Sequence, residues 1–110
     1  MKLLARHCSH GAPALDDAAI AALLPQVPAW HVEDDHLQRE YAFRDYHETI
    51  AFVNALAWMI HGQDHHPQLL VSYRHCGVAF TTHSAGNHIS ENDFICAAKA
   101  DAIYTERASA

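Results

Sequence analysis

The sequence has no apolar run near the roughly 20 consecutive residues that a membrane-spanning helix needs. The apolar stretch at its start, Leu3-Leu4-Ala5, is too short for the core of a signal peptide. Cys8, Cys76 and Cys96 are widely spaced and form no C-x-x-C pair, which argues against a disulfide framework and fits a reducing compartment. We therefore expect a soluble, cytoplasmic protein.

Basic residues are also few. Seven Lys and Arg stand against thirteen Asp and Glu, so the formal net charge is −6 with neutral histidines. An acidic chain lacks the positive field that attracts the phosphate backbone, which argues against a nucleic acid as a direct partner. The chain is instead rich in histidine, with eleven among 110 residues.

The length of the chain suits one domain. We expect residues 1–14, which mix Gly11, Pro13 and polar residues, to form a flexible N-terminal arm, and residues 15–110 to form a single domain. A domain of this size buries only a thin core, so it would gain from burying more surface in an oligomer. A broad apolar stripe over residues 46–60 fits this, because it could be covered by the chain's own sheet and by another subunit.

Hydrophobic periodicity and turn residues predict a short helix followed by two strand–strand–helix units. The expected elements are a helix over 16–24, strands over 30–32 and 37–43, a helix from 46 that stops at Gly62, strands over 69–73 and up to 83, and a helix from Ser90 to about Glu106. The turn of the second hairpin falls at Arg74-His75 or nearer Gly77. This order predicts an α+β fold, with a four-stranded antiparallel sheet, two long helices packed on one face, and a short N-terminal helix.

The densest group of ionisable side chains is Asp64-His65-His66-Pro67, followed by Thr81-Thr82-His83. Pro67 disfavours a helical conformation at His66, so the chain should be extended there. His83 is expected to end the next strand of the same hairpin. In an antiparallel hairpin the start of the first strand lies beside the end of the second, so topology alone makes residues 66–67 and 82–83 neighbours.

Three interpretations of this cluster stay open from the residues alone. The histidines could be surface or capping residues of a histidine-rich chain. His61 and His65 could share a helix face beside Asp64 and hold zinc, although no H-E-x-x-H motif is present. Two histidines on opposite sides of a small substrate could instead act as acid and base near neutral pH, with Asp64 orienting one ring.

Short motifs recur along the chain around this cluster. They are Trp30, Leu37-x-Arg39-x-Tyr41-x-Phe43, Asp45-Tyr46, Ala51-Phe52, Asp64-His65-His66-Pro67, Val71-x-Tyr73, Thr82-His83 and Ser90-x-x-Asp93. Taken together, these motifs resemble the pterin-4a-carbinolamine dehydratases over nearly the whole chain. The His-His-Pro and Thr-His pair at this separation is the more specific part.

The resemblance implies an enzyme that removes water from a 4a-hydroxy-tetrahydropterin to give the quinonoid dihydropterin, in recycling of tetrahydrobiopterin. It implies no metal and no cofactor, and a homodimer or homotetramer in the pathway of an aromatic amino-acid hydroxylase. His65 and His83 would transfer protons and His66 would mainly bind and position the pterin. Pro67, Thr82 and Ser84 would complete the pocket wall.

Two positions depart from the family pattern. His61 stands where a glutamate is usual, and together with Asp64 it is a candidate for the second layer of the site. The loop over 87–90 is one residue longer than the usual pattern. These departures keep an alternative function open, in which the same fold serves as a non-catalytic dimerisation or assembly cofactor.

Overall fold

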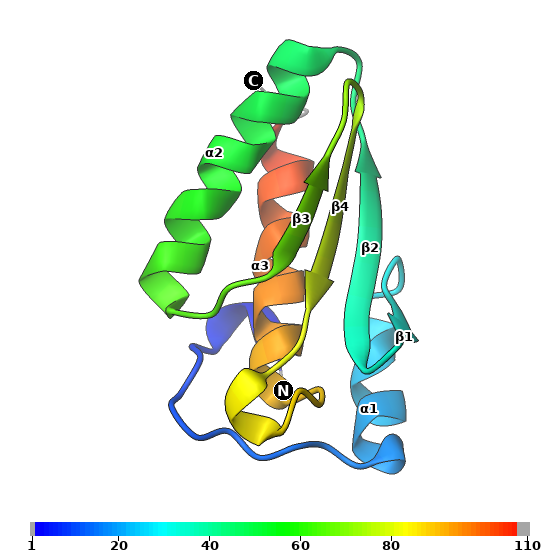
Figure 1. Ribbon diagram of the computed structural model, residues 1–110, viewed down its shortest axis with the longest axis vertical. Coiled ribbons are helices and arrows are strands. Elements are labelled where there is room, and N and C mark those ends of the chain that lie inside the picture. Colours follow the sequence, from blue (N-terminus) through cyan, green and yellow to red (C-terminus); the bar gives the residue numbers. More distant parts are fainter. Residues whose placement is uncertain (1, 108–110) are drawn as a thin grey trace.

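Four strands form one antiparallel sheet in the order β1-β2-β4-β3 (Figure 1) in the computed structural model, which describes residues 2–107. The strands are β1 (His31–Glu33), β2 (His36–Ala42), β3 (Gln68–Val71) and β4 (His75–Phe80). The helices are α1 (Asp17–Leu23), α2 (Tyr46–Gln63) and α3 (Glu91–Arg107), with short 3-10 helices η1 (Leu3–Ala5), η2 (Leu24–Gln26) and η3 (His83–Ala85). The predicted α+β fold is confirmed. Within the described residues, no helix has the length and apolar character needed to cross a membrane.

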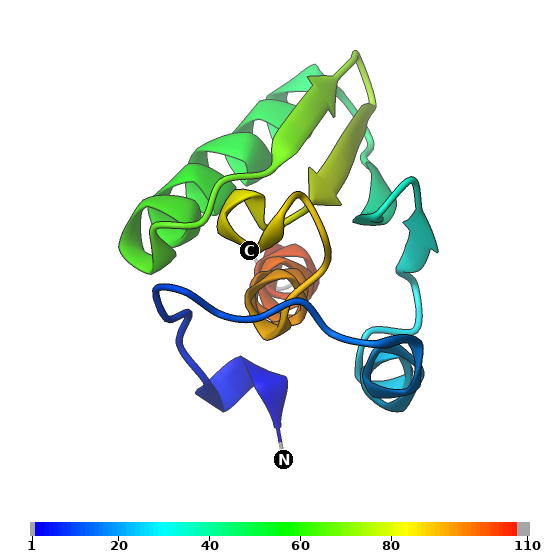
Figure 2. The ribbon, with the colours of Figure 1, turned by 60° about the horizontal axis from the view of Figure 1, so that its bottom comes forward.

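One face of the sheet is buried beneath the two long helices. Leu37 and Tyr41 on β2, and Cys76, Val78 and Phe80 on β4, are all almost fully buried. They alternate along their strands because successive side chains point to opposite faces. In Figures 1 and 2 both α2 and α3 lie on this side of the sheet, as predicted.

A half-buried carboxylate of α3 joins this helix to the sheet. Asp101 Oδ1 accepts hydrogen bonds from Trp30 Nε1 at 3.0 Å, Arg39 Nη1 at 2.7 Å and Tyr41 Oη at 2.6 Å. Burial, and then this carboxylate, raise the pKa of Tyr41. The phenol is therefore a fixed donor that holds β2 against α3.

The long helix α2 passes through Gly62, so the expected stop at this glycine was wrong. Asp64 takes the left-handed conformation instead, with φ of 52°. Asp64 N donates to His61 O at 3.3 Å and His65 N donates to Ile60 O at 3.4 Å, which is the pair of bonds of a Schellman motif. This motif ends the helix abruptly and turns the chain at His65 away from the helix axis.

The second hairpin turns over residues 72–75, since Ser72 N donates to His75 O at 2.9 Å, which agrees with the first of the two predicted positions. Its register pairs Gln68 with Ala79. Strand β4 ends at Phe80, so the expected strand up to His83 was too long, and His83 begins η3. The hairpin still leads the segments 65–67 and 81–83 away from the same end of the sheet.

The N-terminal residues run across the beginning of α3 (Figure 2). Leu3 is 1% exposed and belongs to the core. The flexibility expected of residues 1–14 stays a prediction, and Met1 lies outside the described residues. The path of residues 2–14, however, brings part of this arm to the pocket described next.

Candidate active site

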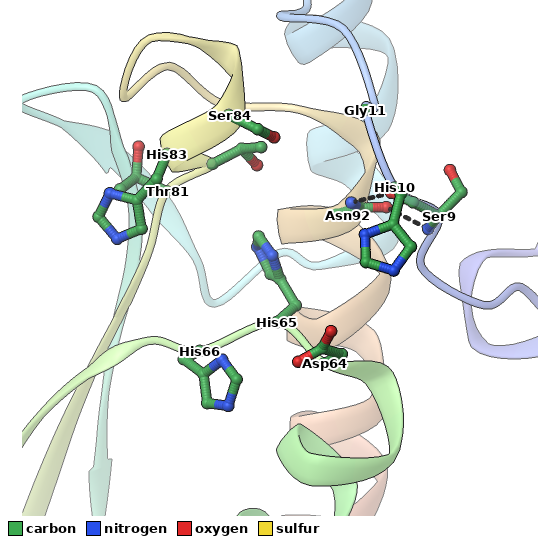
Figure 3. A pocket seen from close by; sticks show the side chains of 11 residues that line it. Ser9, His10, Gly11, Asp64, His65, His66, Thr81, His83, Ser84 and Asn92 are labelled. Carbon is green, nitrogen blue, oxygen red and sulfur yellow. Dashed lines mark hydrogen bonds between the residues drawn. The ribbon is translucent and has the colours of Figure 1, made fainter.

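A cavity of about 270 Å³ opens at the end of the sheet where α2 ends, η3 begins and α3 begins (Figure 3). Four separate segments form its wall. Its lining residues are Ser9, His10, Gly11, Asp64, His65, His66, Thr81, Thr82, His83, Ser84 and Asn92. This volume is close to the lower end of the range for small-molecule pockets, which suits a single small ring system.

Most residues singled out in the sequence meet at this cavity. They are Asp64, His65, His66, Thr82, His83 and Ser84. Pro67 and His61 are not among the lining residues. His61 borders a shallow hollow on α2 with Asn54, Ala57 and Trp58. The Schellman turn separates the directions of His61 and His65, although four residues would place them on one face of a continuous helix.

His65 is the most firmly held of the histidines that line the pocket. Its Nε2 lies 2.5 Å from Asp93 Oδ1, and its ring stacks on Phe80 with centroids 5.9 Å apart and an interplanar angle of 9°. The side chain of His65 is 11% exposed and that of Asp93 is 0% exposed. A carboxylate accepts but does not donate, so Nε2 carries a proton and Nδ1 is the nitrogen available for chemistry.

The carboxylate that holds His65 is itself fixed by a chain of hydrogen bonds. Asp93 Oδ2 accepts from Ser90 N and from Thr82 Oγ1, both at 2.9 Å. Thr82 Oγ1 lies 2.6 Å from Ser90 Oγ, which accepts from Asn92 N at 3.2 Å. Because the Thr82 hydroxyl donates to the carboxylate, the Ser90 hydroxyl must donate to Thr82. Every donor in this series of hydrogen bonds therefore points toward Asp93.

This arrangement sets the protonation of His65. Its burial alone would lower the pKa of the imidazole, but the hydrogen bond and the charge of Asp93 outweigh that effect and raise the pKa above its usual value. Asp64 and Cys8 add in the same direction. His65 is thus suited to hold a proton close to neutral pH and to donate it.

His83 has a different environment. It is exposed, and its Nδ1 lies 2.7 Å from Asn87 Oδ1. An amide oxygen only accepts, so Nδ1 of His83 carries the proton and Nε2 presents a free lone pair in the neutral ring. His66 is also exposed and lines the cavity. The pocket therefore has one buried histidine stabilised as a cation and one exposed histidine that is held by an amide oxygen.

Sequence reasoning missed the role of Asp93. The motif Ser90-x-x-Asp93 is part of the family resemblance and is typical of the cap that begins a helix, but neither feature assigns Asp93 to His65. One oxygen of Asp93 does contribute to that cap, while the other binds His65, and Asp64 makes no such hydrogen bond. Across residues 2–107, no group of three or more His, Cys, Asp or Glu side chains is arranged to hold a metal ion.

Comparison with known proteins assigns the chain to a family. The sequence model described as pterin 4 alpha carbinolamine dehydratase matches residues 13–103. The chain belongs to the pterin-4a-carbinolamine dehydratase family. The expected resemblance is therefore confirmed, and the match covers every pocket segment except residues 9–11.

Curated proteins that carry the pterin-4-alpha-carbinolamine dehydratase name are similar over most of their length. One from Stenotrophomonas maltophilia (strain K279a) is 52% identical over 91 residues, which is 81% of this chain and 78% of that protein. One from Chromobacterium violaceum is 45% identical over 106 residues, covering 94% and 97% of the two chains.

A solved structure has the same architecture. The crystal structure of a transcriptional coactivator/pterin dehydratase from Brucella melitensis superposes with a TM-score of 0.77 at 27% identity, covering 82% of this chain and 97% of that one. This agreement supports both the order of the sheet and the placement of the two long helices.

Proposed function

We propose that this protein dehydrates a 4a-hydroxy-tetrahydropterin to the quinonoid dihydropterin and water, as an enzyme of tetrahydrobiopterin recycling. Family membership supports this reaction. The observation that carries it in this chain is the pairing of His65 with the buried Asp93 at a cavity that His66 and His83 also line. Catalysis would need neither a metal nor a cofactor.

The environments of the two histidines suggest their roles. His65, with its pKa raised and its Nε2 bound to Asp93, donates a proton from Nδ1 to the departing 4a-hydroxyl, which leaves as water. The lone pair of a substrate ring nitrogen assists this departure. Nε2 of His83 accepts the proton that the pterin ring loses. Because His83 is exposed, it can pass that proton on to water. His66 binds and positions the pterin, and Thr82 supports Asp93 while lining the wall with Ser84.

A stopped-flow assay with freshly generated 4a-hydroxy-tetrahydropterin tests the function. The protein should accelerate dehydration over the spontaneous rate, and His83→Ala should lower kcat/KM by about 10²-fold, the usual contribution of a general base. His75→Ala is the matched control, because His75 is also exposed but lies at the opposite end of β4. Full activity in His83→Ala, or no acceleration by the unmodified protein, would refute the proposal.

We further propose a homodimer or homotetramer that packs through α2. Trp58 is 81% exposed and Tyr46 is 50% exposed on this helix, which is unusual for large aromatic residues of a monomer surface. A groove of about 480 Å³ also lies between α2 and α3, with Phe52 and Ile103 in its wall. Light scattering should give a multiple of the chain mass, and Trp58→Glu should reduce it.

The cytoplasm is the compartment that we propose, because it keeps thiols reduced. Cys8, Cys76 and Cys96 are all free thiols in the structure. A thiol titration of protein purified without reductant from the cytoplasm should find all three.

A further inference from the structure

One wall of the pocket comes from a part of the chain that the family match does not include. Ser9, His10 and Gly11 line the cavity, whereas the match begins at residue 13. In Figure 3, His65 lies between His83 on one side and His10 on the other. The pocket therefore has a fourth histidine, and the family assignment gives it no role.

The backbone beside His10 is fixed to α3 by a side-chain clamp. Asn92 Oδ1 accepts from Ser9 N at 3.1 Å, and Asn92 Nδ2 donates to Ser9 O at 2.8 Å. Asn92 is 6% exposed, so its side chain is held in place from within the protein while Ser9 stays at the surface. One residue earlier, Cys8 N donates to Gln63 Oε1 at 2.8 Å, which ties the arm to the end of α2 as well.

The arm is also anchored on both sides of this clamp. Leu3 is buried in the core, and Leu3 N donates to Gln26 Oε1 at 3.0 Å. After the pocket, Leu15 N donates to Ile89 O at 2.8 Å and Ala14 forms a bridge with Ser90. The segment that carries His10 is thus held between two attachment points and crosses the pocket in a defined position.

We propose that His10 is a substrate-binding residue that hydrogen-bonds the pterin from the side of the pocket opposite His83. This inference rests on the proposed function. An imidazole can both donate and accept, and the pyrimidinone edge of a pterin offers both amide-like donors and acceptors. A contact made equally in the bound substrate and in the transition state lowers KM without changing kcat.

Kinetics of three variants test the role. His10→Ala should raise KM roughly 2- to 13-fold with kcat little changed, which is the range for one neutral hydrogen bond. His10→Gln, which keeps a donor and an acceptor, should recover most of this loss. His75→Ala, far from the pocket, should leave both constants at their original values. The dissociation constant of a stable 7,8-dihydropterin, measured by calorimetry, should change in parallel with KM.

Disulfide formation between Cys8 and Cys96 reports whether the N-terminal arm is docked, and so distinguishes a loss of substrate binding from a loss of arm structure. Cys8 Sγ lies 3.5 Å from Cys96 Sγ, so diamide should join them when the arm is docked. The two thiols lose two electrons and two protons and form a disulfide, and diamide becomes the hydrazine. His10→Ala should form this disulfide at the original rate, because the Asn92 clamp is intact.

Each outcome decides between distinct conclusions. If His10→Ala binds and turns over substrate like the original protein, the inference on His10 is wrong while the proposed function stands. If His10→Gln is as impaired as His10→Ala, or if the alanine variant loses its disulfide, the effect is structural and the inference is wrong. An original protein that neither binds the dihydropterin nor accelerates dehydration would overturn both.

Discussion

The replacement Asp93→Asn tests the centre of the proposed mechanism. Asp93 is fully buried, and its two oxygens accept three hydrogen bonds from His65, Ser90 and Thr82. Asparagine has nearly the same shape but no charge, and only one of its two terminal atoms accepts. The substitution therefore removes the negative charge beside His65, and one of the two acceptors, with little change in volume.

The size of the effect follows from the bond that is lost. A hydrogen bond to a charged group contributes about 1.5–3 kcal/mol. If that interaction holds His65 in its proton-donating state, its loss corresponds to a fall of roughly 10- to 150-fold in kcat/KM. The pKa of His65 should also fall, because burial would then act with less opposition from Asp93. The alkaline limb of the pH–rate profile, which reports loss of the His65 proton, should move to lower pH.

Stopped-flow kinetics across the pH range, corrected for spontaneous dehydration, would measure both effects. Asp101→Asn is the matched control, because Asp101 lies on the same helix and accepts three hydrogen bonds but is remote from the pocket. It should lower the free energy of unfolding while leaving the pH profile in place. Asp93→Asn protein that is folded by circular dichroism yet keeps its alkaline limb and a kcat/KM within about twofold of the original would refute the role assigned to Asp93.

Three further predictions concern residues around the pocket. Because the pKa of His65 is raised in the folded state, the stability that His65 contributes should be complete below about pH 6.5 and lost as pH rises through the folded pKa. In urea unfolding, His65→Gln should therefore lose most stability at low pH. A difference in the free energy of unfolding that stays the same at every pH would contradict this. Asp64→Gly should raise the free energy of unfolding by about 1 kcal/mol, since glycine adopts the left-handed conformation without penalty; a lower melting temperature would count against the Schellman assignment. His61→Ala should leave kcat/KM within about twofold, because His61 borders another hollow, and a larger loss measured by stopped flow would place it in the site.

Much of the pocket could be predicted because it follows from local rules. Pro67 required an extended chain after the long helix, and the hairpin required its two ends to meet. Those two facts bring His66 and His83 to one cavity even though β4 ends at Phe80 and not at His83. The prediction that these two segments are neighbours tolerates an error of a few residues in the position of a strand end, because the chain continues in the same direction beyond the strand.

The partner of His65 could not be predicted in the same way. A carboxylate four positions into a capping sequence is explained by local geometry, and the cap needs only one of its oxygens. The second oxygen of Asp93 is used by a residue 28 positions away, and that contact depends on how α3 packs under the end of the sheet. The contacts of the N-terminal arm could not be predicted for a similar reason, since the Asn92 clamp on Ser9 spans 83 positions and leaves no periodic signal in the sequence.

The departure at His61 carries less weight once the end of α2 is known. Spacing of four residues places His61 above His65 only if the helix continues through both. The left-handed Asp64 ends the helix between them, and the backbone bond from His65 N to Ile60 O fixes the direction in which the chain leaves. His65 then receives its negative partner from α3, through Asp93, and not from the preceding turn of α2. A histidine at position 61, where the family resemblance led us to expect a glutamate, is therefore compatible with a fully oriented His65, and the chemistry of this pocket depends on the Asp93 network.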